Sequence, residues 1–376
     1  MIFIEREILF LKGGEELEQF YCGTRIVSGA GTIGYLKELG IRRLLLVTDP
    51  FFMKNGTARR VAEAAGAESY EIFSQIQPDP SVELAAEGTA AVRSFGPDTV
   101  VALGGGSAMD CAKAMAYFSG LKPRLVAIPT TSGSGSEVTD FAILTHGKVK
   151  HPLVDKKLCP EVAILDSDLL KQLPPSLVAD AGFDVLCHAL EAYVATGAGA
   201  ITDALARDAF CSAFGALPAS FGGDTSVRQR IHAASTMAGL AFTQAGLGLC
   251  HAMAHSLGGR FHLPHGRLTA ILLPGVIGCN AHAVGGKYAR LARSAGLTGA
   301  ADTVAVRNLK NALIRLRREL KLPDTLAQAG IDPGEVRFHA KDIVRATLED
   351  PCCGTNPLKV EDFMVMQVLE EVTGRV

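Results

Sequence analysis

The chain of 376 residues lacks the segments that would place it in a membrane or an export pathway. It has no run of roughly 18 or more apolar residues, the length that a membrane-spanning helix needs. Residues 1–20 carry charges inside their apolar stretch and show no cleavage-site pattern. The sequence therefore predicts neither a membrane span nor a secretory signal.

An excess of charge of one sign is also missing. The chain has 37 Lys and Arg residues against 39 Asp and Glu residues, a formal net charge of -2. Such a balance provides no general field for holding nucleic acid or an anionic membrane. One basic run, residues 310–321, alternates with apolar residues at helical spacing, which predicts a solvated helix face. We expect a small-molecule partner, and neither nucleic acid nor a membrane.

The cysteines do not form a recognisable disulfide framework. There are nine of them, an odd number, at irregular spacing. This usage is typical of free thiols in a reducing compartment, and it predicts a cytoplasmic protein.

Repeats and low-complexity tracts are absent as well, so the chain has the character of a compact enzyme, with 48% hydrophobic residues and 40 glycines. Its length suits two domains of about 150–200 residues each. Strand and helix patterns alternate up to residue 165, with buried apolar runs at 42–49, 98–106 and 124–130. This alternation predicts a parallel sheet covered by helices on both faces.

The pattern changes at Pro174 and Pro175, which mark a domain boundary. Beyond them Ala, Leu and Arg dominate, and helices are expected near 177–195, 201–215, 226–243, 247–257 and 300–320. The predicted fold is thus an α/β dinucleotide-binding domain, residues 1–175, followed by an all-helical domain, residues 176–376.

Two polar loops follow strands of the predicted sheet. Residues 104–110, GGGSAMD, run from a strand into a helix, where glycine backbone amides and the helix N-terminus can approach phosphate oxygens. Met109 departs from the G-x-G-x-x-G pattern, and a tight turn without a ligand is the alternative. Residues 129–137, PTTSGSGSE, offer five hydroxyl groups after the next strand. Two such loops at strand ends are typical of a ligand site in an open α/β sheet.

Asp49 ends the first long strand. A carboxylate in that position can bind the adenosine ribose and repel a 2′-phosphate, which favours NAD over NADP. The alternative is a turn-forming or helix-capping role beside Pro50.

Five of the ten histidines predict a metal site. A fifteen-residue stretch contains His251, His255, His262 and His265, and His188 follows Asp184 at the i, i+4 spacing that shares one helix face. A lone histidine is usually a hydrogen-bonded structural residue. Here the surroundings are apolar, and burying several imidazoles and a carboxylate is costly unless a cation binds them. Spacing alone does not decide which histidines are ligands.

The segments GGGSAMDCAK (104–113), PTTSGSGSEVT (129–139), GFDVLCHALEAY (182–193) and GLCHAMAHSLG (248–258) joined to FHLPHG (261–266) follow one another in this order. With them the chain resembles the iron-containing (group III) alcohol dehydrogenase family over residues 20–376. The resemblance implies the dehydroquinate synthase-like fold of that family, NAD(H) as cofactor, and Fe²⁺ as the metal, with Zn²⁺ as a common substitute.

Carried over by position, the resemblance assigns roles to single residues. The metal ligands fall on Asp184, His188, His251 and His265. His255 falls on a non-ligand position and becomes a candidate proton relay, and His262 is left as a structural residue. Phe141 and Phe242 fall on pocket-lining positions, which suits a short neutral substrate. Cofactor contacts fall on Asp49, Gly105, Gly106, Ser107, Thr130, Thr131, Ser134 and Lys150.

Within the family, segments 242–266, 106–119 and 149–153 resemble the 1-propanol dehydrogenases associated with propanediol-using bacterial microcompartments. The implied reaction interconverts short-chain primary alcohols and aldehydes such as 1-propanol and propanal. Ethanol, butanol, 1,3-propanediol and sulfoacetaldehyde enzymes of the family share much of the pattern. The resemblance also implies a homodimer through an edge strand near 20–27, and a microcompartment, with its shell or enzymes, as a candidate location. The residues before Phe20 are either a docking segment or a loosely ordered end.

Two other functions fit the sequence less well. A lyase of the dehydroquinate synthase type must bind a phosphate and a carboxylate, yet segments 182–193 and 242–258 contain no Lys or Arg. A noncatalytic scaffold would be indicated by the loss of a ligand or of the glycine turn, and both are intact.

Overall fold

The computed structural model describes residues 19–147 and 149–374, which form two compact units. Of these described residues, the first unit contains those up to Thr130 together with those of Ser136–Asp166, and the second contains Thr131–Gly135 together with those from Ser167 onward. The domain boundary predicted at residues 175–176 stays a prediction. The segment before Phe20, for which a docking role and a loosely ordered end are the alternatives, lies outside the described residues except for Gln19.

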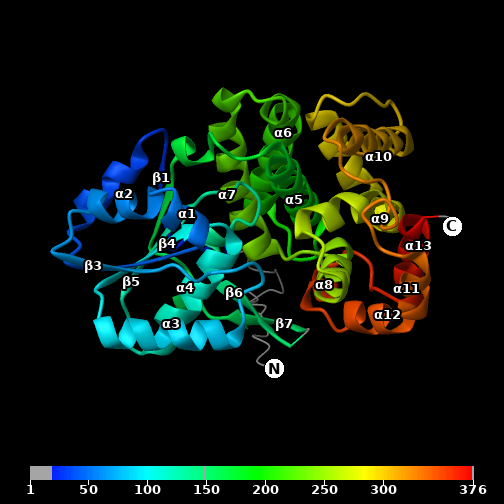
Figure 1. Cartoon of the computed structure of the whole chain (residues 1–376). Coiled ribbons are helices and arrows are strands. Elements are labelled where there is room, and N and C mark those ends of the chain that lie inside the picture. The colour runs from blue at the N-terminus through cyan, green and yellow to red at the C-terminus, as the bar shows by residue number, and fades with distance from the viewer. Residues whose placement is uncertain (1–18, 148, 375–376) are drawn as a thin grey trace, which may run out of the picture. The chain divides into compact units, whose positions relative to one another are not determined.

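A six-stranded parallel sheet organises the first unit (Figure 1), with the strand order β1-β8-β5-β4-β2-β3. The strands are β1 (Arg25–Ser28), β2 (Arg43–Thr48), β3 (Ser69–Phe73), β4 (Thr99–Gly104), β5 (Arg124–Pro129) and β8 (Val162–Leu165). The central strands β2, β4 and β5 are buried almost throughout, as their apolar runs predict. The predicted parallel α/β sheet is confirmed.

Helices cover this sheet on opposite faces, with α2 on one side and α3 and α4 on the other (Figure 1). The elements are η1 (Thr32–Leu39), α1 (Pro50–Lys54), α2 (Thr57–Ala64), α3 (Val82–Phe95), α4 (Gly106–Ser119), η2 (Ser136–Val138) and η3 (Lys156–Leu158). Side chains at alternate strand positions, such as Leu45 and Val100, join Met109 and Met115 of α4 in one core cluster. An antiparallel hairpin, β6 (Phe141–His146) and β7 (Val149–Val154), was not predicted.

The second unit is helical. Its elements are η4 (Ser167–Leu170), α5 (Pro175–Val194), α6 (Ala200–Phe221), η5 (Thr225–Val227), α7 (Arg228–Ala245), α8 (Leu249–Phe261), α9 (His265–Ser294), α10 (Asp302–Glu319), α11 (Pro333–Phe338), α12 (Ala340–Leu348), η6 (Pro351–Thr355) and α13 (Asp362–Thr373). Helix α5 is buried on all sides over most of its length, so it forms the centre of this unit. Its polar residues are therefore forced into an apolar interior.

Helix α9 is long and apolar enough to cross a membrane by length and composition alone. Two thirds of its most apolar window (67%) is buried inside the protein. Val284 has a non-helical backbone and interrupts the helix. These features are those of a core helix packed inside a folded unit.

Two smaller expectations have different outcomes. All nine cysteines are free, as predicted. The solvated helix face predicted for residues 310–321 is wrong for Arg317, which is 5% exposed. Arg317 binds Asp324 and the carbonyl oxygens of Ala270 and Ile271, so its charge holds α10 against α9.

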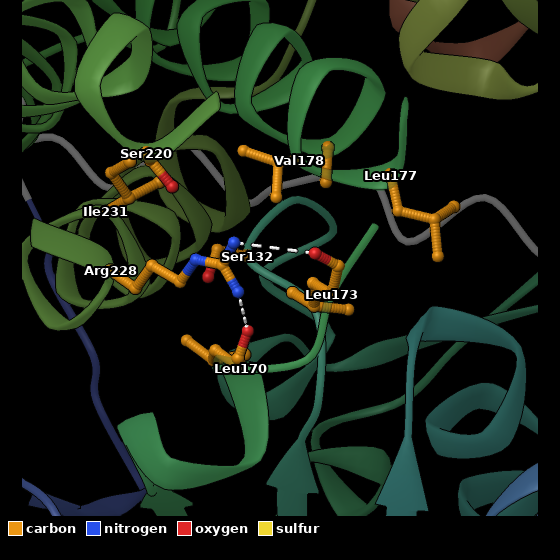
Figure 2. Close-up of a pocket in the computed structure, with 9 residues that line it drawn as sticks. Ser132, Leu170, Leu173, Leu177, Val178, Ser220, Arg228 and Ile231 are labelled. Atoms are coloured by element: carbon orange, nitrogen blue, oxygen red, sulfur yellow. Dashed lines mark hydrogen bonds between the residues drawn. The ribbon is translucent and has the colours of Figure 1, made fainter. Parts of the chain in front are cut away.

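A second buried arginine lines a small cavity of the helical unit (Figure 2). Arg228, at the start of α7, is 6% exposed, and its guanidinium donates hydrogen bonds to the carbonyl oxygens of Leu170 and Leu173. These carbonyls end η4 and the turn that leads into α5. Arg228 therefore fastens the chain before α5 to α7.

We expect Arg228→Ala to lower the free energy of unfolding by about 2 kcal/mol, because two carbonyl oxygens lose a charged donor inside the protein. The shift of the urea unfolding midpoint measures this. Arg230→Ala, at an exposed position of the same helix, serves as the control and should change stability by less than about 0.5 kcal/mol. Equal effects of the two substitutions would contradict the structural role of Arg228.

Candidate metal centre

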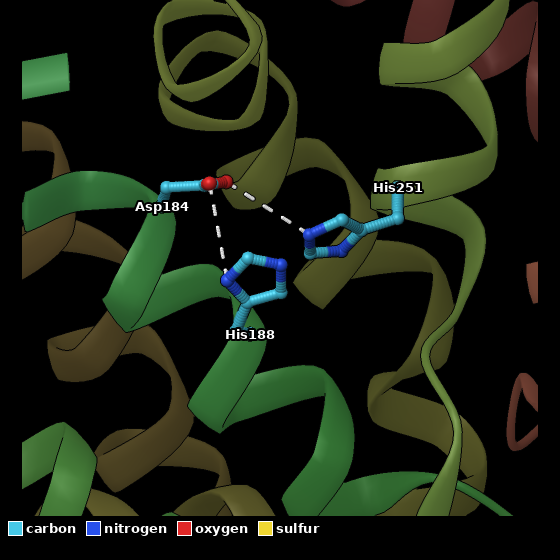
Figure 3. A group of neighbouring side chains, drawn as sticks. All are labelled: Asp184, His188 and His251. Atoms are coloured by element: carbon cyan, nitrogen blue, oxygen red, sulfur yellow. Dashed lines mark ion pairs between the residues drawn. The ribbon is translucent and has the colours of Figure 1, made fainter. Parts of the chain in front are cut away.

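A carboxylate and an imidazole share one face of the central helix α5. Asp184 and His188 lie one turn apart, and Asp184 Oδ2 is 3.9 Å from His188 Nδ1 (Figure 3). Both side chains are more than nine-tenths buried. The i, i+4 spacing thus places two ligand-type side chains together, as predicted.

Two further histidines approach the same carboxylate from other helices. His251 of α8 and His265 of α9 bring their Nε2 atoms within 3.9 Å and 3.6 Å of Asp184 Oδ1. The rings of His188 and His251 are stacked with centroids 4.4 Å apart, and those of His251 and His265 lie 5.3 Å apart. All four residues assigned as ligands from the sequence are brought together.

The chemistry of this cluster fits a divalent cation. Among the described residues, His188 Nδ1 and His251 Nε2 are buried and have no hydrogen-bond partner. Leaving such atoms unpaired inside a protein is costly. Metal-ion donor sets of this kind, one carboxylate with neutral imidazoles, are typical of iron and zinc sites.

Burial determines the charge of the cluster. It lowers the pKa of His251 to about 3 and that of His188 well below its usual value, so both imidazoles are neutral. It raises the pKa of Asp184 well above its usual range. A cation at this point would stabilise the charged carboxylate and use the imidazole lone pairs.

A second carboxylate, which was not predicted from the sequence, contacts His251. Glu191 Oε2 is 2.6 Å from His251 Nδ1, and both side chains are almost fully buried. Burial raises the pKa of Glu191 to about 7, although backbone amides that donate to it lower the pKa. Glu191 lies seven residues after Asp184 and three after His188. This spacing puts all three on one helix face, so Glu191 could have been predicted from the sequence.

His255 lies beside the cluster and has a carboxylate of its own. Its Nδ1 is 2.9 Å from Asp350 Oδ2, and its ring is stacked on that of His265 with centroids 5.2 Å apart. Although burial raises the pKa of Asp350, hydrogen bonds from His255 and Cys352 lower it overall. Asp350 is distant in sequence, and no local pattern pointed to it. His262, expected to be structural, is the exposed C-cap of α8 in a left-handed conformation.

The two phenylalanines predicted to line a pocket lie in different units. Phe242 of α7 is stacked on His188, with ring centroids 4.5 Å apart, so an apolar surface adjoins the cluster. Phe141 begins β6 in the first unit, where its ring lies 5.9 Å from Lys113 Nζ.

The predicted nucleotide residues gather at one edge of the parallel sheet. Asp49 follows β2, Gly105, Gly106 and Ser107 follow β4, and Thr130 follows β5. The chain passes from β2 to β3 on one side and returns to β4 on the other, so the topological switch point lies between β2 and β4. Ligands of open α/β sheets bind outside the carboxyl ends of the strands at such a point.

Gly104 sets the shape of this edge. Its φ of +155° is rare for residues with a side chain, and a Cβ there would lie 2.6 Å from the Cβ of Ala108. Its carbonyl accepts the N–H of Thr130 at 2.9 Å, which ties the two polar loops together. Position 104 therefore favours glycine, because both the backbone conformation and the closeness of Ala108 disfavour a side chain.

Several residues predicted to contact the cofactor have other partners in the structure or belong to the second unit. Asp49 caps α1 by accepting the N–H groups of Phe51 and Phe52, which is the alternative considered for it. Lys150 of β7 pairs with Asp79 at 2.7 Å. Thr131 and Ser134 belong to the segment that clusters with the second unit.

Comparisons with known proteins agree with this fold. The family model for iron-containing alcohol dehydrogenase matches residues 23–167, and the model for the C-terminal part of the Fe-containing alcohol dehydrogenase family matches residues 178–373. The 1-propanol dehydrogenase of Citrobacter freundii is 40% identical over 375 residues, covering 95% of this chain and 100% of that protein. The NADPH-dependent butanol dehydrogenase of Clostridium saccharobutylicum is 36% identical over 370 residues, covering 92% and 95%.

Solved structures agree as well. A 1,3-propanediol oxidoreductase has a TM-score of 0.90 at 30% identity, covering 95% of this chain and 100% of that one. The sulfoacetaldehyde reductase of Bifidobacterium kashiwanohense, in complex with NAD⁺, has a TM-score of 0.85 at 28% identity, covering 95% and 98%. Because the family models match the α/β and the helical parts alike, the chain belongs to the iron-containing alcohol dehydrogenase family and is an oxidoreductase of the EC 1.1.1 class.

Proposed function

We propose that the protein is an NAD(H)-linked dehydrogenase that interconverts short-chain primary alcohols and aldehydes, with 1-propanol and propanal as the pair. The observation that carries the proposal is the cluster of buried Asp184, His188 and His251 with partly buried His265, in a chain of the iron-containing family. The 1-propanol dehydrogenase at 40% identity supports the choice of substrate.

The metal ligands are Asp184, His188, His251 and His265, and the metal is Fe²⁺, with Zn²⁺ as an alternative. Bound there, the cation would act as a Lewis acid on the substrate oxygen while the nicotinamide carries the hydride. The three imidazoles bind as neutral groups, since burial already keeps His188 and His251 unprotonated.

His255 serves as the proton relay. Asp350 accepts a hydrogen bond from the Nδ1–H of His255, which leaves Nε2 as the nitrogen that can take up or release a proton. The same bond fixes the orientation of the ring beside His265.

The cofactor is held at the edge of the sheet. Backbone amides of Gly105, Gly106 and Ser107 receive the phosphates, beside the hydroxyl of Thr130 from the next loop. Thr131, Ser134 and Lys150 stay cofactor contacts predicted from the resemblance. Asp49 takes the ribose and disfavours a 2′-phosphate, which supports NAD(H) over NADP(H). The NADPH-dependent butanol enzyme among the relatives makes this preference one to measure.

Phe242 limits the substrate to a short neutral chain, and Phe141 stays a pocket-lining prediction from the resemblance. A phenyl ring stacked on His188 provides apolar contact and no group that can pair with a sulfonate. This favours propanal over sulfoacetaldehyde, while ethanol, butanol and 1,3-propanediol remain the nearest alternatives. A homodimer through an edge strand near residues 20–27 and an association with a microcompartment stay predictions from the resemblance, and a cytoplasmic location stays a prediction from the cysteine usage.

We expect the protein reconstituted with Fe²⁺ to oxidise NADH with propanal faster than with other C2–C6 aldehydes, and to use NADPH poorly. A panel of aldehydes and alcohols with both cofactors, followed at 340 nm, measures this. A clear preference for sulfoacetaldehyde, or for NADPH, would contradict the substrate or the cofactor part of the proposal separately.

Asp184→Ala and His265→Ala should lose bound metal and activity together. Loss of a Lewis acid worth several kcal/mol corresponds to a fall in kcat of about 1,000-fold or more. Metal analysis of the purified variants beside the NADH assay checks this. His282→Ala, at an exposed position on the same helix as His265, is the control and should keep both. A metal-free variant with full activity would refute the assignment.

His255→Ala should keep its metal yet lower kcat by about 100-fold, the usual contribution of a general acid or base. The change should be accompanied by a different pH dependence of kcat. If this variant instead loses metal, His255 is a ligand and the relay is elsewhere.

A further inference from the structure

The start of helix α8 is capped entirely by side chains from other parts of the chain. Helix N-termini leave backbone N–H groups without partners inside the helix, and the N-cap residue here, Gly248, has no side chain to supply one. Glu191 accepts the N–H groups of Gly248 at 3.0 Å, Cys250 at 2.7 Å and His251 at 3.3 Å. Asn356 accepts the remaining one, from Leu249, at 3.1 Å.

Gly248 makes room for both caps. A Cβ at this position would lie 2.8 Å from Asn356 Oδ1 and 2.9 Å from Glu191 Oε1. A residue with a side chain would displace the two acceptors. The glycine, the glutamate and the asparagine therefore form one arrangement around the first turn of α8.

Glu191 does more than cap the helix. Its Oε2 also lies 2.6 Å from His251 Nδ1, closer than any backbone nitrogen that it binds. Since Oε2 already accepts the N–H groups of Gly248 and His251, we assign Nδ1 as the donor of this bond. With Nδ1 donating, the lone pair of the ring is on Nε2, the atom that lies 3.9 Å from Asp184 Oδ1 and has no hydrogen-bond partner. One carboxylate thus fixes the helix, the ring orientation and the tautomer.

We propose that Glu191 is the positioning residue of the metal centre, which holds His251 with Nε2 facing Asp184 by binding its Nδ1 and the first turn of α8 at once. The inference rests on the proposed function in that His251 is taken as a ligand. Outer carboxylates of this kind orient metal-binding histidines and increase their basicity.

The placement on α5 explains why one residue can do this. Asp184, His188 and Glu191 follow one another at i, i+4 and i+7, so a single buried helix face presents two ligands and the support of a third. Glu191 thereby joins α5 to α8, and the distance between the two halves of the ligand set is fixed before any cation binds.

Asn356 offers a matched comparison. It caps the same turn and is as deeply buried as Glu191, but its other bonds go to Asn280 and the carbonyl of Leu358, and within the described part of the chain none goes to an imidazole. Removing it weakens the cap and leaves the ring of His251 held.

The test is the dissociation constant for Zn²⁺, and for Fe²⁺ under anaerobic conditions, measured by chelator competition on metal-free full-length protein. In Glu191→Gln the amide keeps the size of the side chain but turns an N–H towards groups that are already donors. We expect its metal affinity to fall about 10–100-fold, the usual effect of losing such a support. Asn356→Ala should lower the melting temperature but change the affinity by less than about 3-fold.

Unchanged affinity in Glu191→Gln, or an equal loss in Asn356→Ala, would overturn the inference, since the second result reduces Glu191 to a helix cap. If Glu191→Gln does not fold, ¹⁵N NMR of histidine-labelled, metal-free wild-type protein decides. We expect Nδ1 of His251 to carry the proton, and a proton on Nε2 would overturn the inference. Normal metal binding by Asp184→Ala would instead refute the proposed ligand set, whatever Glu191 does.

Discussion

The burial of one carboxylate among three imidazoles is the constraint on which the second unit depends. Helix α5 is enclosed by apolar neighbours, yet it carries Asp184, His188 and Glu191 on one face. An interior of this kind shifts every ionisable group towards its neutral form, and the pKa changes of Asp184 and His251 follow from that. The cost is offset only by partners with matching chemistry: a cation for the inner atoms, and backbone amides and a second carboxylate for the outer ones.

Two histidines of helix α8 make the same kind of hydrogen bond to a carboxylate, but in different environments. His251 and His255 lie one turn apart, and each gives its Nδ1 to a carboxylate, Glu191 in one case and Asp350 in the other. Glu191 is enclosed and its pKa is raised, whereas the pKa of Asp350 is lowered by its hydrogen bonds. The first pair holds an imidazole inside the buried cluster, and the second orients an imidazole that is partly open to solvent. Environment, and not residue type, separates the two pairs.

In the first unit, the ends of the strands determine where the polar residues of the predicted nucleotide site lie. Buried strands with apolar residues on both faces can lie only inside a sheet covered by helices, and their carboxyl ends then meet at one edge. Asp49, the glycine turn and Thr130 reach that edge by sequence position alone. Even so, the structure gives Asp49 a capping bond that a strand pattern could not separate from a ligand role.

Local pattern determined the strands β2, β4 and β5, most of the long helices, the pairing of Asp184 with His188, and the glycine turn, because each depends on neighbours a few residues apart. The sequence did not predict the β6–β7 hairpin, the burial of Arg317, or Asp350 as the partner of His255. These depend on contacts between segments far apart in the chain, where spacing carries no signal. Spacing predicted a metal site with five imidazoles as candidates, and the resemblance narrowed these to His188, His251 and His265. Which nitrogen atoms approach Asp184 was decided only by the packing of α8 and α9 against α5, since the position of a helix in a bundle is set by side-chain packing and not by its own sequence period.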